Sequence, residues 1–483
     1  MALVNANSPV TLLMPMELFA NAPVQDQIKN VIYEKARPSS QLNTGGYIEI
    51  DVNSNLDEYI KLDEINLYVK FRVEFFRDER NIVTIGDWDN ISLVNNAMHS
   101  MFNQVDLSIN DQQTTISLQT YAHKAYLRNL LYSYPEERKT YLELCGFFED
   151  DEVTHKDGIS ANRRSLIEHR EASKDRKTRE DAKAAKKTTT TDTTATAAAT
   201  ADATTAAIQD VNIGRTCEFM GKLQLDLLNQ YKFLLGGTKL RFKLVMNRPE
   251  FLFISSNEKL RPQINLIDIY LDIPKYIVTD DLCVAHNEAL KISPAKYPIT
   301  RFEVKSHTID KDVTNKNIEN VCVGKLPNEI FVALVENESF NGQIKTNPFL
   351  YKHFDLYSIA CCFNGRRIEY KLDFNGSIIT ETYMGFLKSI NQTDGSNIRT
   401  MITRDRFANG YTIYGFKLNQ DASGGFLNSG HVNIPVEGVV RFEFQFSKQT
   451  PKTLNAIFAF SYDNLLSIIG GEQGQERFPS VDY

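Results

Sequence analysis

The clearest pattern along this chain is an alternation of apolar and polar residues with a period of two. It is strictest between Ile65 and Phe75, where every second residue is isoleucine, leucine, valine or phenylalanine. Because successive side chains of a strand point to opposite faces, such a stretch buries one face and leaves the other in water. The pattern predicts a half-buried antiparallel strand.

The same alternation recurs through both halves of the chain. It is found at 105–109, 223–227, 239–244 and 269–273, and again at 302–304, 329–335, 355–363, 411–418, 440–446 and 454–462. The hairpin signal Asn364-Gly365 directly follows one of these stretches. Many short strands separated by turns favour β-sandwiches or barrels over a parallel α/β sheet.

Helical patterns are few, and one of them divides the chain. They cover 120–131, 135–144, 280–290 and 382–390. The third begins at Asp280, a suitable N-cap, and falls between the two sets of strands. We therefore predict a first β-domain at 46–278, a connecting helix at 279–291 and a second β-domain at 292–470.

The two ends of the chain and one internal segment fall outside these domains. Residues 1–45 carry four prolines among short apolar clusters, which predicts an extended arm that docks on another surface. Residues 471–483 form a C-terminal tail. Residues 155–212 include a charged run, Arg163 to Lys187, and then a stretch of Thr, Ala and two Asp. We expect a low-complexity loop insertion there, at most weakly helical in its charged half.

Composition narrows the class of protein. The 483 residues are 42% hydrophobic and 24% charged, which excludes a wholly disordered or coiled-coil chain. The net charge of −7 is not that of a dedicated nucleic-acid binder. No apolar run approaches the roughly 18 residues of a membrane span. No basic residue precedes Lys29, so the charged region of a signal peptide is missing.

Signatures of catalysis are absent from the sequence. It lacks the H-E-x-x-H, G-x-S-x-G and P-loop patterns, and its eight histidines are scattered singly. Neighbouring carboxylates such as Asp280-Asp281 are better explained as a solvated face. We therefore predict no catalytic residue, no cofactor and no metal site.

Several short motifs, in a shared order, resemble the major capsid proteins of Polintons (Mavericks) and adintoviruses. They are Glu17-Leu18-Phe19-Ala20, Leu67-Tyr68-Val69-Lys70, His99-Ser100-Met101-Phe102, Ala295-Lys296-Tyr297-Pro298, Gly324-Lys325-Leu326-Pro327, Asn347-Pro348-Phe349, Ala408-Asn409-Gly410-Tyr411 and Tyr462-Asp463-Asn464. The resemblance covers nearly the whole chain and fails only over the predicted insertion.

The resemblance implies a fold and a function. It implies an all-β double jelly roll, two consecutive eight-stranded domains with a few short helices. Three copies would form a hexon-like, pseudo-hexameric capsomer of an icosahedral capsid around double-stranded DNA. The expected partners are further copies of the chain, with penton and minor capsid proteins, and the DNA would not be contacted sequence-specifically. The expected location is the virion capsid, assembled in the host cytoplasm or nucleus.

Two sets of site residues follow from this expectation. Aromatic residues in loops are candidates for subunit contacts, with an intrachain core as the alternative; they are Phe340, Phe349, Phe407 and Tyr411. Gly470 and Gly471 end a sequence similar to the sites cut by adenovirus-type maturation proteases, with the end of a strand as the alternative.

Two other functions remain open from the residues alone. A jelly-roll carbohydrate-binding protein would need a concave polar site with stacking aromatic rings, and it would not need to form trimers. A jelly-roll glycosidase would need two carboxylates facing each other at roughly 5 to 10 Å.

Overall fold

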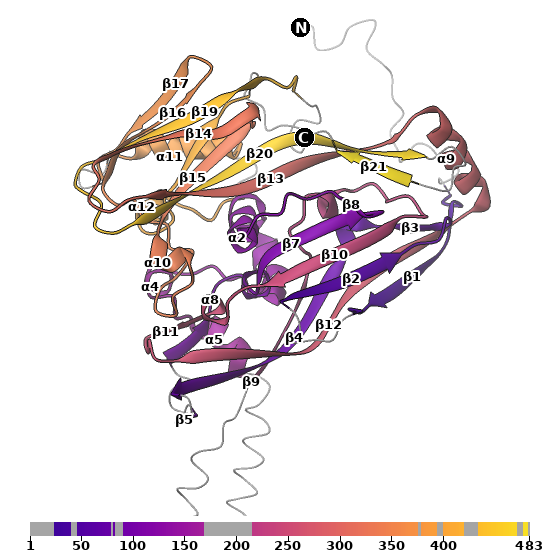
Figure 1. The fold of residues 1–483 in the computed structure, drawn as a ribbon, viewed down its shortest axis with the longest axis horizontal. Coiled ribbons are helices and arrows are strands. Elements are labelled where there is room, and N and C mark those ends of the chain that lie inside the picture. Colours follow the sequence, from indigo (N-terminus) through magenta and orange to yellow (C-terminus); the bar gives the residue numbers. More distant parts are fainter. Residues whose placement is uncertain are drawn as a thin grey trace, which may run out of the picture.

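The computed structural model of the protein consists of two β-rich blocks, one from each half of the chain (Figure 1). The structure describes residues 24–39, 46–78, 81–82, 90–168, 215–374, 378–393, 399–419, 433–470 and 477–481.

The first block contains two main antiparallel sheets and a small two-stranded one. One sheet has the order β1 (Ile28–Ala36), β12 (Arg261–Val278), β4 (Asn66–Asp78) and β5 (Asn81–Ile82), with β3 (Glu58–Ile60) also on β12 and β9 (Arg215–Gly221) also on β4. The other has the order β2 (Tyr47–Asn53), β10 (Lys239–Met246), β7 (Phe102–Ile109) and β8 (Gln112–Gln113). The small sheet pairs β11 (Phe253–Ser255) with β6 (Ile91–Leu93).

The second block repeats this arrangement. One sheet has the order β13 (Ala295–Ile309), β20 (Leu454–Gly470), β15 (Glu329–Glu336) and β18 (Ile413–Lys417), with β21 (Arg477–Val481) also on β20. The other has the order β14 (Asn315–Lys325), β19 (Glu437–Phe446), β16 (Leu356–Phe363) and β17 (Arg366–Lys371). Asn364 and Gly365 both have positive φ between β16 and β17, as a two-residue hairpin turn requires.

The alternating pattern decides which face of each strand is buried. In β4 the apolar set from Leu67 to Phe75 has no exposed surface, while Arg72 on the opposite face is exposed. In β19, Val440, Phe442 and Phe444 are fully buried on one face of the strand. Each block therefore closes its sheets over a core supplied by every second residue.

Helices lie around and between the blocks. They are α1 (Ala97–Ser100), α2 (Tyr121–Tyr132), α3 (Pro135–Arg138), α4 (Glu152–Asp157), α5 (Ala161–Glu168), α8 (Pro249–Leu252), α9 (Asp280–Ile292), α10 (Asn337–Phe340), α11 (Thr380–Ser389) and α12 (Arg404–Ala408), with 3₁₀ turns at Leu62–Glu64, Leu142–Cys145 and Leu227–Asn229. None of the helices in the described ranges is long and apolar enough to cross a membrane.

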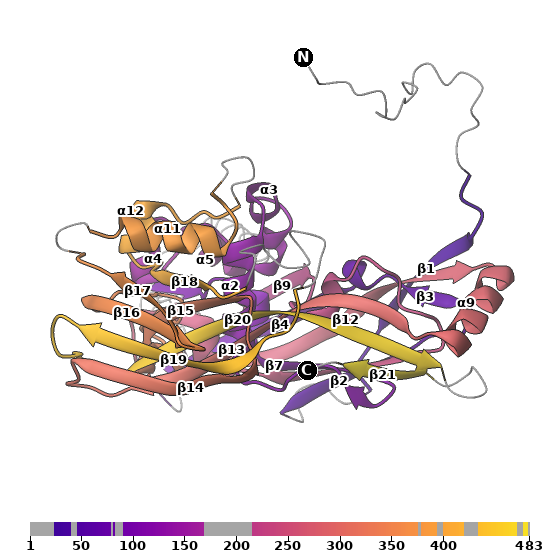
Figure 2. The ribbon, with the colours of Figure 1, turned by 90° about the horizontal axis from the view of Figure 1, so that it is seen from above.

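Helix α9 connects the blocks at one end of the molecule, where the long strands β13 and β20 reach across from the second block (Figures 1 and 2). Its N-cap is Thr279, one residue before the predicted Asp280, which is instead the first helical residue. An acidic residue in the first turn is still favourable, because it faces the positive end of the helix dipole.

Three segments differ from the expected boundaries. Part of the predicted arm forms β1, and part of the predicted tail forms β21. β1 is an edge strand exposed at most positions, so its sequence lacks a clean alternation. The start of the predicted insertion forms the end of α4 and all of α5, and Arg163 within it is completely buried. The rest of that insertion, 169–212, lies outside the described residues.

Candidate functional site

Three of the four aromatic residues expected at subunit contacts lie inside the protomer. Phe349 and Phe407 have no exposed surface, and Tyr411 is 1% exposed. Phe340 is half-buried against the same core. Side chains without exposed surface cannot pack against another subunit, so the expectation is wrong for Phe349, Phe407 and Tyr411. The alternative, an intrachain core, describes them.

Two of these aromatic residues join the blocks through α2. Phe349 stacks on Tyr126 of α2 with ring centroids 4.1 Å apart, and Phe340 stacks on His123 of α2 at 5.0 Å. The end of the helix adds polar contacts, since Thr120 Oγ1 donates to the carbonyl of Val304 at 2.7 Å. Helix α2 is therefore packed against both blocks and fixes them to each other.

His155 of α4 forms a second connection between the blocks. Its ring stacks on Tyr411 at 3.8 Å, and its Nε2 donates to the carbonyl of Gly410 at 2.8 Å. The carbonyl of His155 accepts from Asn347 Nδ2 at 2.9 Å. Burial lowers the pKa of His155 to about 4, so the ring is neutral. Gly410 has a φ of +101°, and a Cβ there would lie 2.9 Å from the His155 ring, so this contact requires glycine.

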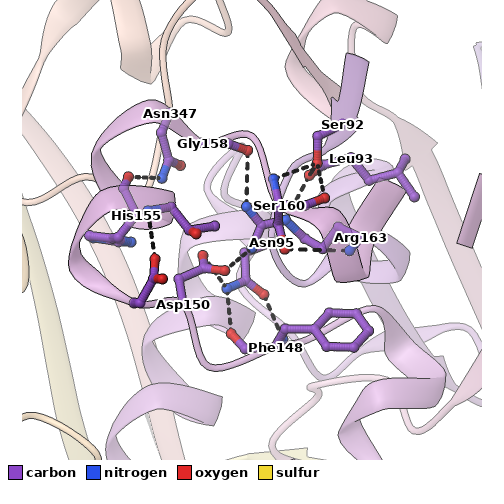
Figure 3. Close-up of polar contacts among 12 residues, drawn as sticks. Ser92, Leu93, Asn95, Phe148, Asp150, His155, Gly158, Ser160, Arg163 and Asn347 are labelled. Atoms are coloured by element: carbon purple, nitrogen blue, oxygen red, sulfur yellow. Dashed lines mark hydrogen bonds and ion pairs between the residues drawn. The ribbon is translucent and has the colours of Figure 1, made fainter. Parts of the chain in front are cut away.

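A buried ion pair holds α5 and the loop that leads to α4 in place (Figure 3). Arg163 and Asp150 are hydrogen-bonded to each other, with 0% and 1% of their side chains exposed. Arg163 also donates to the carbonyls of Leu93 at 2.8 Å and Gly158 at 3.0 Å. Asp150 accepts from Asn95 Nδ2 at 3.1 Å. The two charges are thus compensated by each other and by three neutral partners.

The sequence alone gave no means of finding this pair. Arg163 opens a run of charged residues that reads as solvated, and its partner lies 13 positions earlier in the chain. The network also supports the contact between the blocks, because His155 of α4 is hydrogen-bonded to Gly410 of the second block.

A cavity of about 410 Å³ lies at the junction, lined by residues of both blocks. Glu329 of β15 is 2% exposed and accepts from the hydroxyl of Tyr132 at 3.0 Å. Burial raises the pKa of Glu329 to about 7. The other carboxylate of the lining, Glu137, accepts from the backbone N–H of Tyr134 and so caps α3. Each carboxylate of the lining thus has a hydrogen-bond partner inside the protomer.

Among the residues that the structure describes, no three His, Cys, Asp or Glu side chains form a cluster that could hold a metal ion.

Only part of the candidate processing site lies within the described residues. Ile469 and Gly470 end β20 and pair with Phe478 and Arg477 of β21, whereas Gly471 lies outside the described residues.

Comparison with known proteins bears on the fold. No model of a known protein family matches the chain. An uncharacterised protein of Caenorhabditis elegans is 24% identical over 382 residues, which cover 78% of this chain and 79% of that protein. Among solved structures, the chain is similar to one from the Sputnik virophage, with a TM-score of 0.62 and 11% identity over 98% of this chain and 93% of that one. It is also similar to the mavirus major capsid protein, with a TM-score of 0.52 and 11% identity over 99% and 96%.

These structural matches extend over both blocks and both cores. At such low identity they speak for the fold and not for the activity. The predicted fold class, all-β with two consecutive eight-stranded jelly rolls and a few short helices, is confirmed.

Proposed function

We propose that this protein is a structural major capsid protein of the Polinton (Maverick) and adintovirus type. Three copies form a pseudo-hexameric capsomer, and the capsomers build an icosahedral capsid around a double-stranded DNA genome. The observation that carries the proposal is the likeness to the mavirus major capsid protein over 99% of this chain, which includes both jelly rolls and the junction between them.

The junction supports this function physically. A capsomer with six similar corners can be made from three chains only if each chain presents two similar blocks in a fixed relation. The stacking of Phe349 on Tyr126 and the contacts of His155 hold the blocks in such a relation. These contacts suit a protomer that serves as a building block.

Exposed apolar side chains take the place of the buried aromatics as candidate subunit contacts. On α9, Val284 is 61% and Ile292 is 88% exposed. On the second block, Val323 of β14 lies opposite Val439 of β19, and both are exposed. Exposed apolar side chains that form a contiguous patch mark interaction surfaces in soluble proteins. We assign these four residues to contacts between chains.

The remaining partners follow from the same role. The capsomers bind one another in the capsid lattice, and penton and minor capsid proteins are further partners there. With a net charge of −7, the chain makes no sequence-specific contact with the packaged DNA. The protein functions in the virion capsid, after assembly in the host cytoplasm or nucleus.

Light scattering on the purified protein, followed by electron microscopy, tests the proposal. We expect a particle with three times the mass of the chain and a hexagonal outline, or closed shells. A monomer that persists across salt concentrations, with no ordered particle in the micrographs, would exclude the capsid role.

We also propose that the C-terminal tail is cut after Gly471 during maturation. Since Ile469 and Gly470 are paired with β21, the protease would need this hairpin to open first. Intact-mass measurement on protein from assembled particles tests the cut, and a full-length C-terminus would rule it out.

A further inference from the structure

An apolar groove of about 740 Å³ lies beside α9. This helix connects the two blocks at one end of the molecule (Figure 2). Most of its wall is aromatic or aliphatic; the wall includes Tyr231, Phe233, Tyr276, Leu282, Leu290 and Tyr297. Leu290 and Tyr297 are buried at 8% and 3% exposure, while Tyr231 at the edge is 65% exposed. An open apolar hollow of this size in one protomer is typical of a surface that another segment covers.

The chain itself leads to this groove. Gln25, Gln27 and Ile28 are part of its lining. Their position is fixed, because the backbone N–H of Thr279 donates to the carbonyl of Gln27 at 2.9 Å and Ile28 pairs with Val278. The residues that precede Gln25 therefore start at the edge of the groove.

The sequence just before this point matches the groove in chemistry. Between Pro9 and Ala20 only Thr11 and Glu17 are polar, and the rest are apolar. The segment 1–23 lies outside the described residues. From Ala20 to Gln25 the chain can span at most about 18 Å, so the apolar stretch is held close to the groove.

Charge complementarity points the same way. Two lysines, Lys232 and Lys296, are in the lining, and Lys232 Nζ donates to the carbonyl of Lys296 at 2.9 Å. This contact places the lysine ammonium of Lys232 beside the mouth of the groove. The single charge of the apolar stretch, Glu17, has the opposite sign.

We propose that residues 9–20 of the same chain occupy the groove beside α9. The short tether gives the segment an effective local concentration in the millimolar range, so even a weak contact is populated. The segment would cover the aromatic wall and bring Glu17 to the two lysines. This inference concerns the protomer and does not depend on the capsid role.

Photocrosslinking in the full-length protein tests the proposal. A photoreactive residue is placed at Phe19 (Phe19→p-benzoylphenylalanine), and the adducts are mapped by mass spectrometry. We expect adducts to the groove wall, at residues 231–235 or 276–297, at the mass of a single chain. The matched control is the same substitution at Tyr357, an exposed tyrosine of β16 that should give no adduct in either range. Adducts that join two chains would show that a second copy fills the groove, and adducts elsewhere would show that the segment docks on another surface; either result overturns the proposal.

Hydrogen exchange gives a second readout that does not depend on the photoreactive residue. The variant Leu13→Asp with Phe19→Asp should speed exchange of α9 by about tenfold, because the groove loses its cover. Glu288→Gln, a change at an exposed position of the same helix but outside the lining, is the control and should leave exchange unchanged. Equal exchange in the Asp variant and the wild-type protein would refute the docking.

Discussion

Replacing Arg163 with methionine tests whether the buried ion pair holds the junction together. The substitution keeps most of the side-chain volume but leaves Asp150, with 1% of its side chain exposed, as an uncompensated buried charge. Breaking a buried pair in this way costs about 3–5 kcal/mol. The carbonyls of Leu93 and Gly158 would also lose the hydrogen bonds that Arg163 donates to them.

The effect should be local enough to measure residue by residue. A loss of about 3–5 kcal/mol corresponds to a roughly 150- to 5,000-fold increase in opening of the segment 150–168. Peptide-resolved hydrogen exchange reports that opening directly. Because α4 carries His155 to Gly410, exchange near Gly410 should rise as well.

An exposed ion pair on the neighbouring helix provides the matched control. Lys156 and Glu152 of α4 are four residues apart, with 49% and 44% of their side chains exposed. Lys156→Met should cost no more than about 0.5 kcal/mol. The double variant Arg163→Met with Asp150→Asn should recover part of the loss, since no buried charge is left. If Arg163→Met opens the segment no more than Lys156→Met does, the reasoning about the buried pair is wrong.

Three further predictions concern other parts of the chain. Burial raises the pKa of Glu329 to about 7 from its usual 4.5, so the native state holds this proton more tightly than the unfolded state and loses stability as the pH rises through 7. Glu329→Gln should therefore increase the free energy of unfolding at about pH 8.5 by up to about 3 kcal/mol, which a higher melting temperature would report. Near pH 5 the substitution should change the melting temperature little, and an equal change at both pH values would contradict the prediction. A Cβ at Gly236 would clash with the carbonyl oxygen of Leu56. Gly236→Ala should therefore lower the free energy of unfolding, measured in urea, by roughly 1–3 kcal/mol. Gly46→Ala is the control and should not change this free energy measurably, because the space around Gly46 is open. Ile292→Asp should leave the protomer within about 0.5 kcal/mol of wild type yet lower the trimer fraction in sedimentation, and an unchanged trimer would remove α9 from the contact surface.

The sequence predicts the strands well where one face is buried and the other is wet. The stretch from Ile65 to Phe75 falls inside β4 and its immediate approach, and the Asn364-Gly365 signal forms the predicted hairpin turn. The pattern fails for edge strands. β1 has few buried positions, so no alternation announces it, and it is held by its backbone pairing to β12.

Composition does not show where the helices end and the low-complexity segment begins. Residues 155–168 lead directly into the charged run that follows, yet they form the end of α4 and all of α5, and Arg163 is completely buried. A charged residue is stable in a core only when its partner is delivered by the fold, and Asp150 cannot be identified as that partner from spacing alone. The burial of Arg163 is a property of the tertiary structure.

The sequence does not show which surface covers the aromatic residues of the loops. A phenylalanine in a loop must be covered, but the sequence does not say whether the cover comes from the same chain or from another. In this chain, the surface that covers these rings belongs to the other block. Phe349 meets Tyr126 there, and Tyr411 meets His155. These aromatic anchors are therefore used inside the protomer, and the proposed contacts between protomers involve exposed residues such as Ile292 and Val323. Variants at the buried anchors should unfold the junction inside the protomer. Variants at the exposed residues should instead separate protomers that stay folded. Sedimentation distinguishes a folded monomer from an unfolded one and so tells the two interfaces apart.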